Sequence, residues 1–479
     1  MLVLRTVLRK AFVLSIAMIT TSVMADDRDE LLSFIDGRYE ETADLAQNLW
    51  ELAEVGYQET RSSELLQSEL RAAGFTVEAG VAGIPTAFQA SFGSGGPVIG
   101  ILAEFDALPG INQDAVPQRS PIPGKGAGHA CGHNLFGAGS TGAAIAVAHW
   151  LEQTGRPGTV RLYGTPAEEG GSGKVYMVRA GLFDDVDAVV HWHPSDQNAA
   201  EASTTLANRS AKFRFRGVSA HAAGAPEKAR SALDGVEAFN NMVNLMREHV
   251  PQQTRIHYVI TSGGVAPNVV PDFAEVFYYV RHPEAESVRE IWTRLEAAAK
   301  GAAMGTGTQV DWEIIHGNHP VLVNDVLARM MDEKLRQVGG VQYNSSEQAF
   351  AEQIYTTLNK PGLPLGSEQE VQPFEKSLGY GSTDVGDVSM VVPTVGLNTA
   401  TWVPGTSAHS WQSTAASGMT IGFKGAQVAA KAMSLAVIEM LQNEQLLRDA
   451  RAEFDAWRGD DFVYEALLGD RPPPLDYRN

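Results

Sequence analysis

Four short segments contain the residue types that bind metal ions or transfer protons. The first is a glycine-rich loop over residues 128–134, with the sequence GHACGHN. Its Cys131 and His133 are two residues apart and can both reach one metal ion. Thiolate and imidazole ligands suit zinc, and imidazole with carboxylate also suits manganese. A buried cysteine beside a helix-capping histidine gives the same pattern, and a Cys-x-His pair alone favours that structural role.

The second segment, residues 165–171 (TPAEEGG), has two adjacent carboxylates at the end of a predicted apolar strand. Ligand sites of α/β sheets lie at the carboxyl ends of strands. Neighbouring side chains of an extended segment point to opposite sides. One of Glu168 and Glu169 can therefore bind metal while the other acts on a water molecule as general base. A solvated acidic turn is the alternative, which the strand-end position and the flanking glycines disfavour.

Histidines mark the third and fourth segments. Residues 191–194 (HWHP) end another apolar strand, and residues 406–411 (TSAHSW) lie in a loop before the last predicted helix. A single histidine in either place is usually structural. Four segments rich in Cys, His or Glu, all at strand ends or in loops, are together what a metal centre at the carboxyl edge of a sheet requires.

Strands alternate with helices around these segments, which predicts an α/β sandwich with a largely parallel sheet. Two helices are expected within residues 26–75 from the helical spacing of their apolar residues. A helix of small residues is expected over 137–152. Buried strands are expected at residues 97–103, 159–163 and 186–190. We assign residues 26–206 to the first part of a catalytic domain.

A second domain is expected from Ala207 to Gly317, inserted into the first. Residues 212–216 alternate strictly, as a strand with one exposed face should. A helix, two strands, a helix and a strand follow, at residues 229–249, 255–260, 274–280, 284–303 and 309–315. This β-α-β-β-α-β order is the ferredoxin-like split motif.

The catalytic domain then resumes over residues 318–445. A helix, a strand and a long final helix are expected there, at residues 322–338, 394–397 and 417–441. The polar segment 342–377 contains Phe350 and Phe374, with Tyr380 just after it. These aromatic residues either line an acyl pocket or form a local core. Residues 446–479 are a C-terminal tail, extended after Asp460.

The N-terminal 25 residues have the pattern of a secretory signal peptide. Arg5, Arg9 and Lys10 form a basic start, residues 11–20 are apolar, and Ala25 fits a cleavage site. A membrane anchor is disfavoured because about 20 apolar residues are needed to span a bilayer. We expect export to the periplasm or the medium, and no membrane span in the mature chain.

Charge and cysteine content restrict the partners of the mature chain. Outside the first 25 residues there are 34 basic and 57 acidic residues, a net charge of −23. Such a surface repels phosphate backbones, so nucleic acid is excluded as a partner. Cys131 is the one cysteine of the chain, so no internal disulfide can form, and an exported lone thiol calls for a function.

The motifs, in this order along the chain, resemble those of the aminoacylase and carboxypeptidase G superfamily of co-catalytic metallopeptidases. The matching pieces are residues 106–109, 128–134, 166–170, 192–194, 219–221, 267–272 and His409. The similarity reaches to about Leu441 and is greatest to the amidohydrolase branch with a cysteine in the metal site. It implies a phosphorylase/hydrolase-like catalytic sandwich with an inserted dimerisation lid.

The resemblance also implies roles for individual residues. Cys131 would be a thiolate ligand that bridges two divalent metal ions, zinc or manganese. His133, Glu169, His193 and His409 would complete the coordination. Glu168 would be the general base and acid, and Asp106 would orient a ligand imidazole. Whether Glu104 or His191 contacts metal is left open.

In the lid, the resemblance implies that His221 reaches the active site of a partner subunit and stabilises the tetrahedral intermediate. Asn268 and Arg281 are candidates to hold the substrate carboxylate, Arg281 by a bidentate pair. A surface histidine and an ion-paired arginine are the alternatives. A homodimer through the lid is expected, and a heteromer with a related subunit is the other possibility.

These expectations together predict metal-dependent hydrolysis of the amide bond of N-acyl or N-aroyl amino acids. The resemblance favours an aroyl-glutamate or a dipeptide, with N-acetyl amino acids as the alternative. Two other classes stay open: a thiol hydrolase with Cys131 as nucleophile and His133 or His129 as base, and a non-catalytic binding protein with the same fold.

Overall fold

A mixed β-sheet forms the centre of the larger domain in the computed structural model, which describes residues 28–459 and 461–478. Within those residues the sheet has eight strands, in the order β1-β2-β6-β3-β7-β14-β8 with β9 beside β14. The strands are β1 (Thr76–Ala79), β2 (Phe88–Ser94), β3 (Val98–Ala103), β6 (Gly158–Gly164), β7 (Ala188–Val190), β8 (His193–Ser195), β9 (Ala199–Glu201) and β14 (Thr394–Ala400). Strands β6, β3, β7, β14 and β8 pair in parallel, while β1, β2 and β9 pair antiparallel. The predicted α/β fold is confirmed, and the signal peptide lies outside the described residues.

Helices α4 (His133–Thr154) and α13 (Thr420–Gln442) pack against each other and against the sheet. Their glycines and alanines allow close approach: a Cβ on Gly139 would meet the Ala426 carbonyl oxygen at 3.1 Å. The expectation that no later segment is apolar and long enough to span a membrane is wrong for α13. Most of this helix is buried inside the domain, so its apolar character serves the core.

The other helices surround this core or border the cavity described below. They are α2 (Tyr39–Leu52), α3 (Thr60–Ala72), α5 (Glu168–Gly171), α6 (Gly173–Arg179), α9 (Asp325–Val338), α10 (Ser345–Tyr355), α11 (Val385–Ser389), α12 (Trp411–Ser417) and α14 (Glu444–Arg458). Short strands β4 (Leu108–Pro109) and β5 (Ala127–Gly128) form a small ribbon. The segment around 342–377, expected to be irregular and polar, therefore contains the helix α10.

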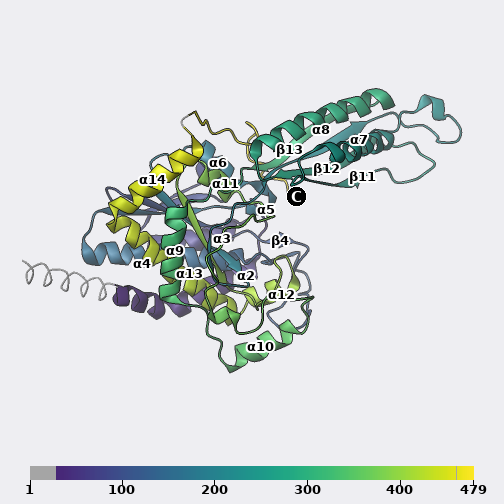
Figure 1. Ribbon diagram of the computed structural model, residues 1–479. Helices are drawn as coiled ribbons and strands as arrows, with labels where there is room; N and C mark the ends of the chain where they lie inside the picture. The colour runs from purple at the N-terminus through teal and green to yellow at the C-terminus, as the bar shows by residue number, and fades with distance from the viewer. Residues whose placement is uncertain (1–27, 460, 479) are drawn as a thin grey trace, which may run out of the picture.

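The inserted domain projects from the catalytic domain as a lid (Figure 1). Its strands β10 (Ala207–Arg216), β11 (Arg255–Ser262), β12 (Phe273–His282) and β13 (Gln309–Asn318) form an antiparallel sheet of order β11-β12-β10-β13. This is the strand order of a ferredoxin-like fold. Helices α7 (Ala232–Met246) and α8 (Ala285–Thr306) cover one face of the sheet and share a core with it.

The C-terminal tail differs from the expected extended segment at its start, because Glu444–Arg458 form the helix α14. Residues 461–478 contain no further helix or strand. They pack on both domains: Leu467 is buried in the lid core, and Leu468 is buried in the catalytic core. The chain therefore returns to the junction between the domains (Figure 1).

Candidate active site and metal centre

All four predicted segments meet at one cavity of about 570 Å³ between the catalytic domain and the lid. Each follows a strand of the central sheet or a loop at the same edge. Strand β3 leads to Glu104, β6 to Glu168, and β7 to His193, while the loop after β14 supplies His409. The carboxyl ends of parallel strands share one edge, and this brings the segments together.

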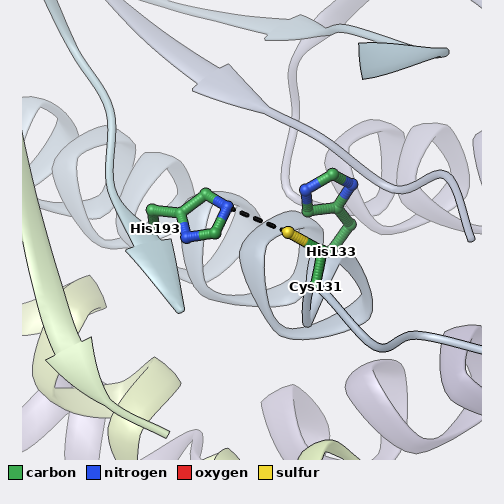
Figure 2. Close-up of side chains that lie close together, drawn as sticks. All are labelled: Cys131, His133 and His193. Atoms are coloured by element: carbon green, nitrogen blue, oxygen red, sulfur yellow. Dashed lines mark hydrogen bonds between the residues drawn. The ribbon is translucent and has the colours of Figure 1, made fainter. Parts of the chain in front are cut away.

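Cys131 and His193 are direct neighbours, with 3.4 Å between Sγ and Nε2 (Figure 2). The rings of His133 and His193 are 5.7 Å apart and nearly perpendicular. Gly132 makes this approach possible. Its φ is 76°, and a Cβ there would lie 2.7 Å from a ring carbon of Pro194. Glycine at this position therefore lets the loop before α4 lie against β8.

Asp106 positions two of the predicted ligands. One carboxylate oxygen is 2.9 Å from Nδ1 of His133, and the other accepts a 2.9 Å hydrogen bond from the backbone N–H of Glu169. A proton on Nδ1 leaves the Nε2 lone pair of His133 free for a metal ion, which is the usual arrangement of ligand histidines. The neighbouring Cys131, Glu104 and Asp106 raise the pKa of His133 well above its ordinary value, although burial opposes the shift.

Glu168 and Glu169 lie in the short turn α5, not in the extended segment that the sequence predicts. Ala167 and Ser172 on either side both have φ of 58°, and Glu169 departs from helical geometry. The two carboxylates are separated by this kinked turn and both line the cavity. Burial, followed by the charges of Glu104 and Glu169, raises the pKa of Glu168 well above its usual range. A raised pKa suits a residue that accepts and then donates a proton.

His409 approaches from the loop before α12. Its Nε2 is 3.1 Å from Oε1 of Glu169, and its backbone N–H donates a 2.9 Å hydrogen bond to Ala130 O. The Ser413 hydroxyl donates to the same carbonyl at 2.7 Å. These bonds fix the histidine loop on the cysteine loop, so two segments almost 280 residues apart are held in register.

Two groups of donor atoms could each hold a metal ion, and Cys131 belongs to both. One is formed by Cys131, His133 and His193, and the other by Cys131, Glu169 and His409. Nε2 of His133 and Oε1 of Glu169 are buried without a hydrogen-bond partner. Buried polar atoms are rarely left unpaired, so these atoms fit coordination to a cation. A shared soft donor between two groups is the arrangement expected of a bridging thiolate.

Glu104, left open from the sequence, lies at the edge of this centre. Its Oε2 is 3.0 Å from Nε2 of His133, and it forms a further possible metal group with His133 and Glu168. Its other oxygen is 2.6 Å from the Lys174 ammonium, which is also 2.6 Å from Asp384. All three side chains of this ion triad are buried. Sequence reasoning missed Lys174 and Asp384, which are 210 residues apart and follow no motif.

The lid contributes the opposite wall of the cavity. Its lining residues are Asn208, Tyr279, Arg281, His316 and Asn318. Arg281 is therefore placed where a substrate-binding role requires it. His221 and Asn268 are exposed on the lid and lie outside this cavity in a single chain. The two are adjacent, since Ala222 N–H donates to Asn268 O at 3.0 Å.

Other expected or open positions have different surroundings. His129 is buried, with Nε2 3.0 Å from Leu49 O and Nδ1 accepting from Asn134 N–H, so it cannot act as a base for Cys131. His191 lines the cavity and lies 3.5 Å from Glu201. Phe350 belongs to a local core. Phe374 packs on the main core and Tyr380 is exposed, so none of the three aromatic residues lines the cavity.

Known proteins share these features. A family model described as peptidase family M20/M25/M40 matches residues 100–363. Over 456 residues the chain is 41% identical to one of the subunits of p-aminobenzoyl-glutamate hydrolase from Escherichia coli (strain K12), a match that covers 88% of this chain and 95% of that protein. It is 30% identical over 437 residues to the Xaa-Arg dipeptidase of Mus musculus, which covers 88% and 90% of the two chains.

Solved structures agree on the fold. A dinuclear metal-binding peptidase of Bacillus subtilis superposes with a TM-score of 0.57 at 19% identity, over 85% of this chain and 99% of that one. An aminobenzoyl-glutamate utilization protein of Klebsiella pneumoniae superposes with a TM-score of 0.59 at 17% identity, over 85% and 96%. At these identities the likeness is one of fold.

Proposed function

This chain belongs to peptidase family M20/M25/M40, and from that membership we propose that it cuts the amide bond between an acyl or aroyl group and an amino acid. The resemblance predicted from the sequence motifs is confirmed, as is the class of metal-dependent amide hydrolase. The observation that carries the proposal is the position of Cys131 in two overlapping donor groups beside the free carboxylate of Glu168.

Two divalent ions, zinc or manganese, are the proposed cofactors. Cys131, His133 and His193 would hold one ion, and Cys131, Glu169 and His409 would hold the other. Bound ions of this kind lower the pKa of a water molecule and polarise the carbonyl of the scissile amide. Cys131 is buried, which raises the pKa of its thiol in the absence of metal. The thiol therefore needs a cation beside it to become a thiolate ligand.

Glu168 is the proposed general base and acid. It faces the cavity beside the donor groups and takes the proton of the attacking water. The same carboxyl then delivers that proton to the leaving amine nitrogen as the C–N bond breaks. Its buried, acid-rich surroundings support this shuttle, because they disfavour a permanently ionised carboxylate.

A homodimer through the lid is proposed to complete the site, with His221 of one chain reaching the cavity of its partner. His221 and Asn268 are exposed at the lid surface and away from the cavity of their own chain. Strand β11 is an edge strand with Val259 and Ile260 exposed. Leu245 of α7 is also exposed. An unpaired edge with apolar side chains supports pairing with a second chain.

An aroyl-glutamate is the proposed substrate class, since the relative that is 41% identical belongs to a p-aminobenzoyl-glutamate hydrolase. Arg281 in the lid wall is the proposed partner of a substrate carboxylate. Because the similar proteins include two different subunits of that hydrolase, a heteromer with a related chain is the alternative assembly. Export after cleavage at Ala25 is proposed from the N-terminal pattern alone.

A thiol hydrolase is the competing mechanism, since Cys131 has His193 within 3.4 Å. Metal removal separates the two mechanisms. We would assay the purified mature protein, metal-loaded and chelator-stripped, on p-aminobenzoyl-glutamate, several N-acetyl amino acids and several dipeptides. Metal-dependent cleavage, restored by zinc or manganese, supports the proposal. Cleavage that survives chelation supports the thiol mechanism, and stoichiometric metal without cleavage of any amide supports a binding role.

A further inference from the structure

The C-terminal tail forms part of the wall of the substrate cavity, although no motif predicted a role for it. Arg478 lines the cavity together with the lid residues Tyr279 and Arg281. Its Nη2 donates a hydrogen bond to the backbone carbonyl of Glu169. The tail thus places a positive charge beside the turn that carries the proposed base.

The tail is held in place by contacts with both domains. Arg471 pairs with Glu313 of the lid at 2.9 Å, and its carbonyl accepts a 2.8 Å hydrogen bond from Arg179 of the catalytic domain. Nearer the end, the Tyr477 hydroxyl donates to Glu169 O at 3.1 Å, and its ring meets the edge of Tyr57 with 5.6 Å between centroids. Arg478 is therefore presented by an anchored segment.

Arg281 and Arg478 are both cations without an acidic partner. No carboxylate of the described residues lies within 4.0 Å of either guanidinium. Nε of each arginine is buried without a hydrogen-bond partner. Each guanidinium instead lies over an aromatic ring, Arg281 at 5.4 Å from Tyr279 and Arg478 at 4.7 Å from Tyr477. Arginines that are partly buried and unpaired are costly unless an anion joins them.

The two guanidinium groups face the same space around Tyr279. A Cβ on Gly170 would lie 3.9 Å from both Nη2 of Arg478 and the hydroxyl of Tyr279. Their shared field reaches His316: burial, then the charges of Arg281 and Arg478, lowers the pKa of His316 to about 3. His316 is therefore neutral at physiological pH and adds no third charge to this wall.

We propose that Arg478 is a second substrate-binding guanidinium and that, with Arg281, it selects amides whose amino-acid half carries two carboxylates. This inference rests on the proposed function. One arginine satisfies the single α-carboxylate of an N-acyl amino acid by a bidentate pair. A second arginine with free donors calls for a second anion. The acidic surface of the chain repels a dianion, so two local cations are what would retain one.

The test compares p-aminobenzoyl-glutamate with p-aminobenzoyl-glutamine, which differ in one carboxylate. We expect the wild-type, metal-loaded chain to prefer glutamate. In Arg478→Gln the glutamate-to-glutamine ratio of kcat/KM should fall by about 10- to 100-fold, the loss of one charge-assisted hydrogen-bonded contact. The loss should lie mainly in KM, and Arg478→Lys should restore part of it. Arg448→Ala, an exposed arginine of α14, is the matched control.

An unchanged ratio in Arg478→Gln would overturn the inference. So would an equal loss on both substrates, because that result would assign Arg478 only the support of the Glu169 carbonyl. If the wild-type chain cleaves neither amide, the proposed function fails, and calorimetry with free glutamate and glutamine then tests the arginine alone. Tighter glutamate binding that Arg478→Gln weakens supports the inference, and equal binding of the two amino acids contradicts it.

Discussion

The two walls of the cavity have opposite chemical character. The catalytic wall concentrates carboxylates, imidazoles and the thiol, and its buried cation Lys174 is already paired with Glu104 and Asp384. The lid and tail wall has amides and the two unpaired arginines Arg281 and Arg478. An electron-rich wall attracts metal ions, and a cationic wall attracts carboxylates. The contrast assigns bond cleavage to one domain and substrate recognition to the other, and single substitutions can test it.

The largest effect is expected from Glu168→Gln in the catalytic wall. Loss of the proton shuttle should lower kcat by about 10²- to 10⁴-fold. Metal content should stay at the wild-type level, because Glu168 is outside the two donor groups that share Cys131. Steady-state kinetics with metal analysis checks both points, with the exposed Glu152→Gln as control. Near-normal turnover in Glu168→Gln would remove this residue from the mechanism.

Next in size is the effect of Lys174→Met on stability. Its ammonium is buried between Glu104 and Asp384, so its removal leaves two buried carboxylates without their cation. We expect the free energy of unfolding to fall by about 3–5 kcal/mol. Denaturant titration of metal-free protein measures this change, with the exposed Lys228→Met as control. A loss below about 1 kcal/mol would mean that the carboxylates become neutral or solvated at little cost.

On the opposite wall, Arg281→Gln should weaken substrate binding and leave the chemistry largely intact. The lost charge-assisted contact should raise KM by about 10- to 100-fold, with a smaller change in kcat. Arg216→Gln in the same lid sheet, where the arginine pairs with Asp311 on the surface, is the control. An effect confined to kcat would move Arg281 from recognition to catalysis and blur the division between the walls.

The smallest effect concerns the repulsion within the acidic wall. Burial, then the charge of Glu104, raises the pKa of Glu201 to about 7, whereas an unfolded glutamate titrates near 4.3. A raised carboxyl pKa favours the protonated fold, so this contribution to stability is full at low pH and is lost as the pH rises through about 7. Glu201→Gln should therefore gain on wild type between pH 5.5 and pH 8, in denaturant titrations of metal-free protein. A pH-independent difference would contradict this.

Sequence patterns were informative where chemistry followed directly on a strand. Cys131, Glu169 and His193 each stand in a short motif beside an apolar run, and the shared carboxyl edge of the sheet then brings them together. The lid was equally readable, because alternating strands and helical periodicity over 110 residues define its order.

Interactions between distant residues were not readable. Lys174 and Asp384 pair across 210 residues, and neither stands in a pattern that predicts a buried ion. The turn at Glu168 depends on backbone angles at Ala167 and Ser172, where a strand was the simpler expectation. Arg478 follows a proline-rich stretch with no periodicity, so only the packing of the tail on both domains reveals its position.

The single cysteine gives the protein a spectroscopic reporter of its own. Since Cys131 is the one thiol in the chain and belongs to both donor groups, a chromogenic disulfide reagent can modify only this atom. Occupied sites should protect the sulfur, and stripped protein should react up to one equivalent per chain. The rate of colour development then reads metal loading in real time without a labelled variant. The same exclusivity means that one oxidation event would disable both ions together.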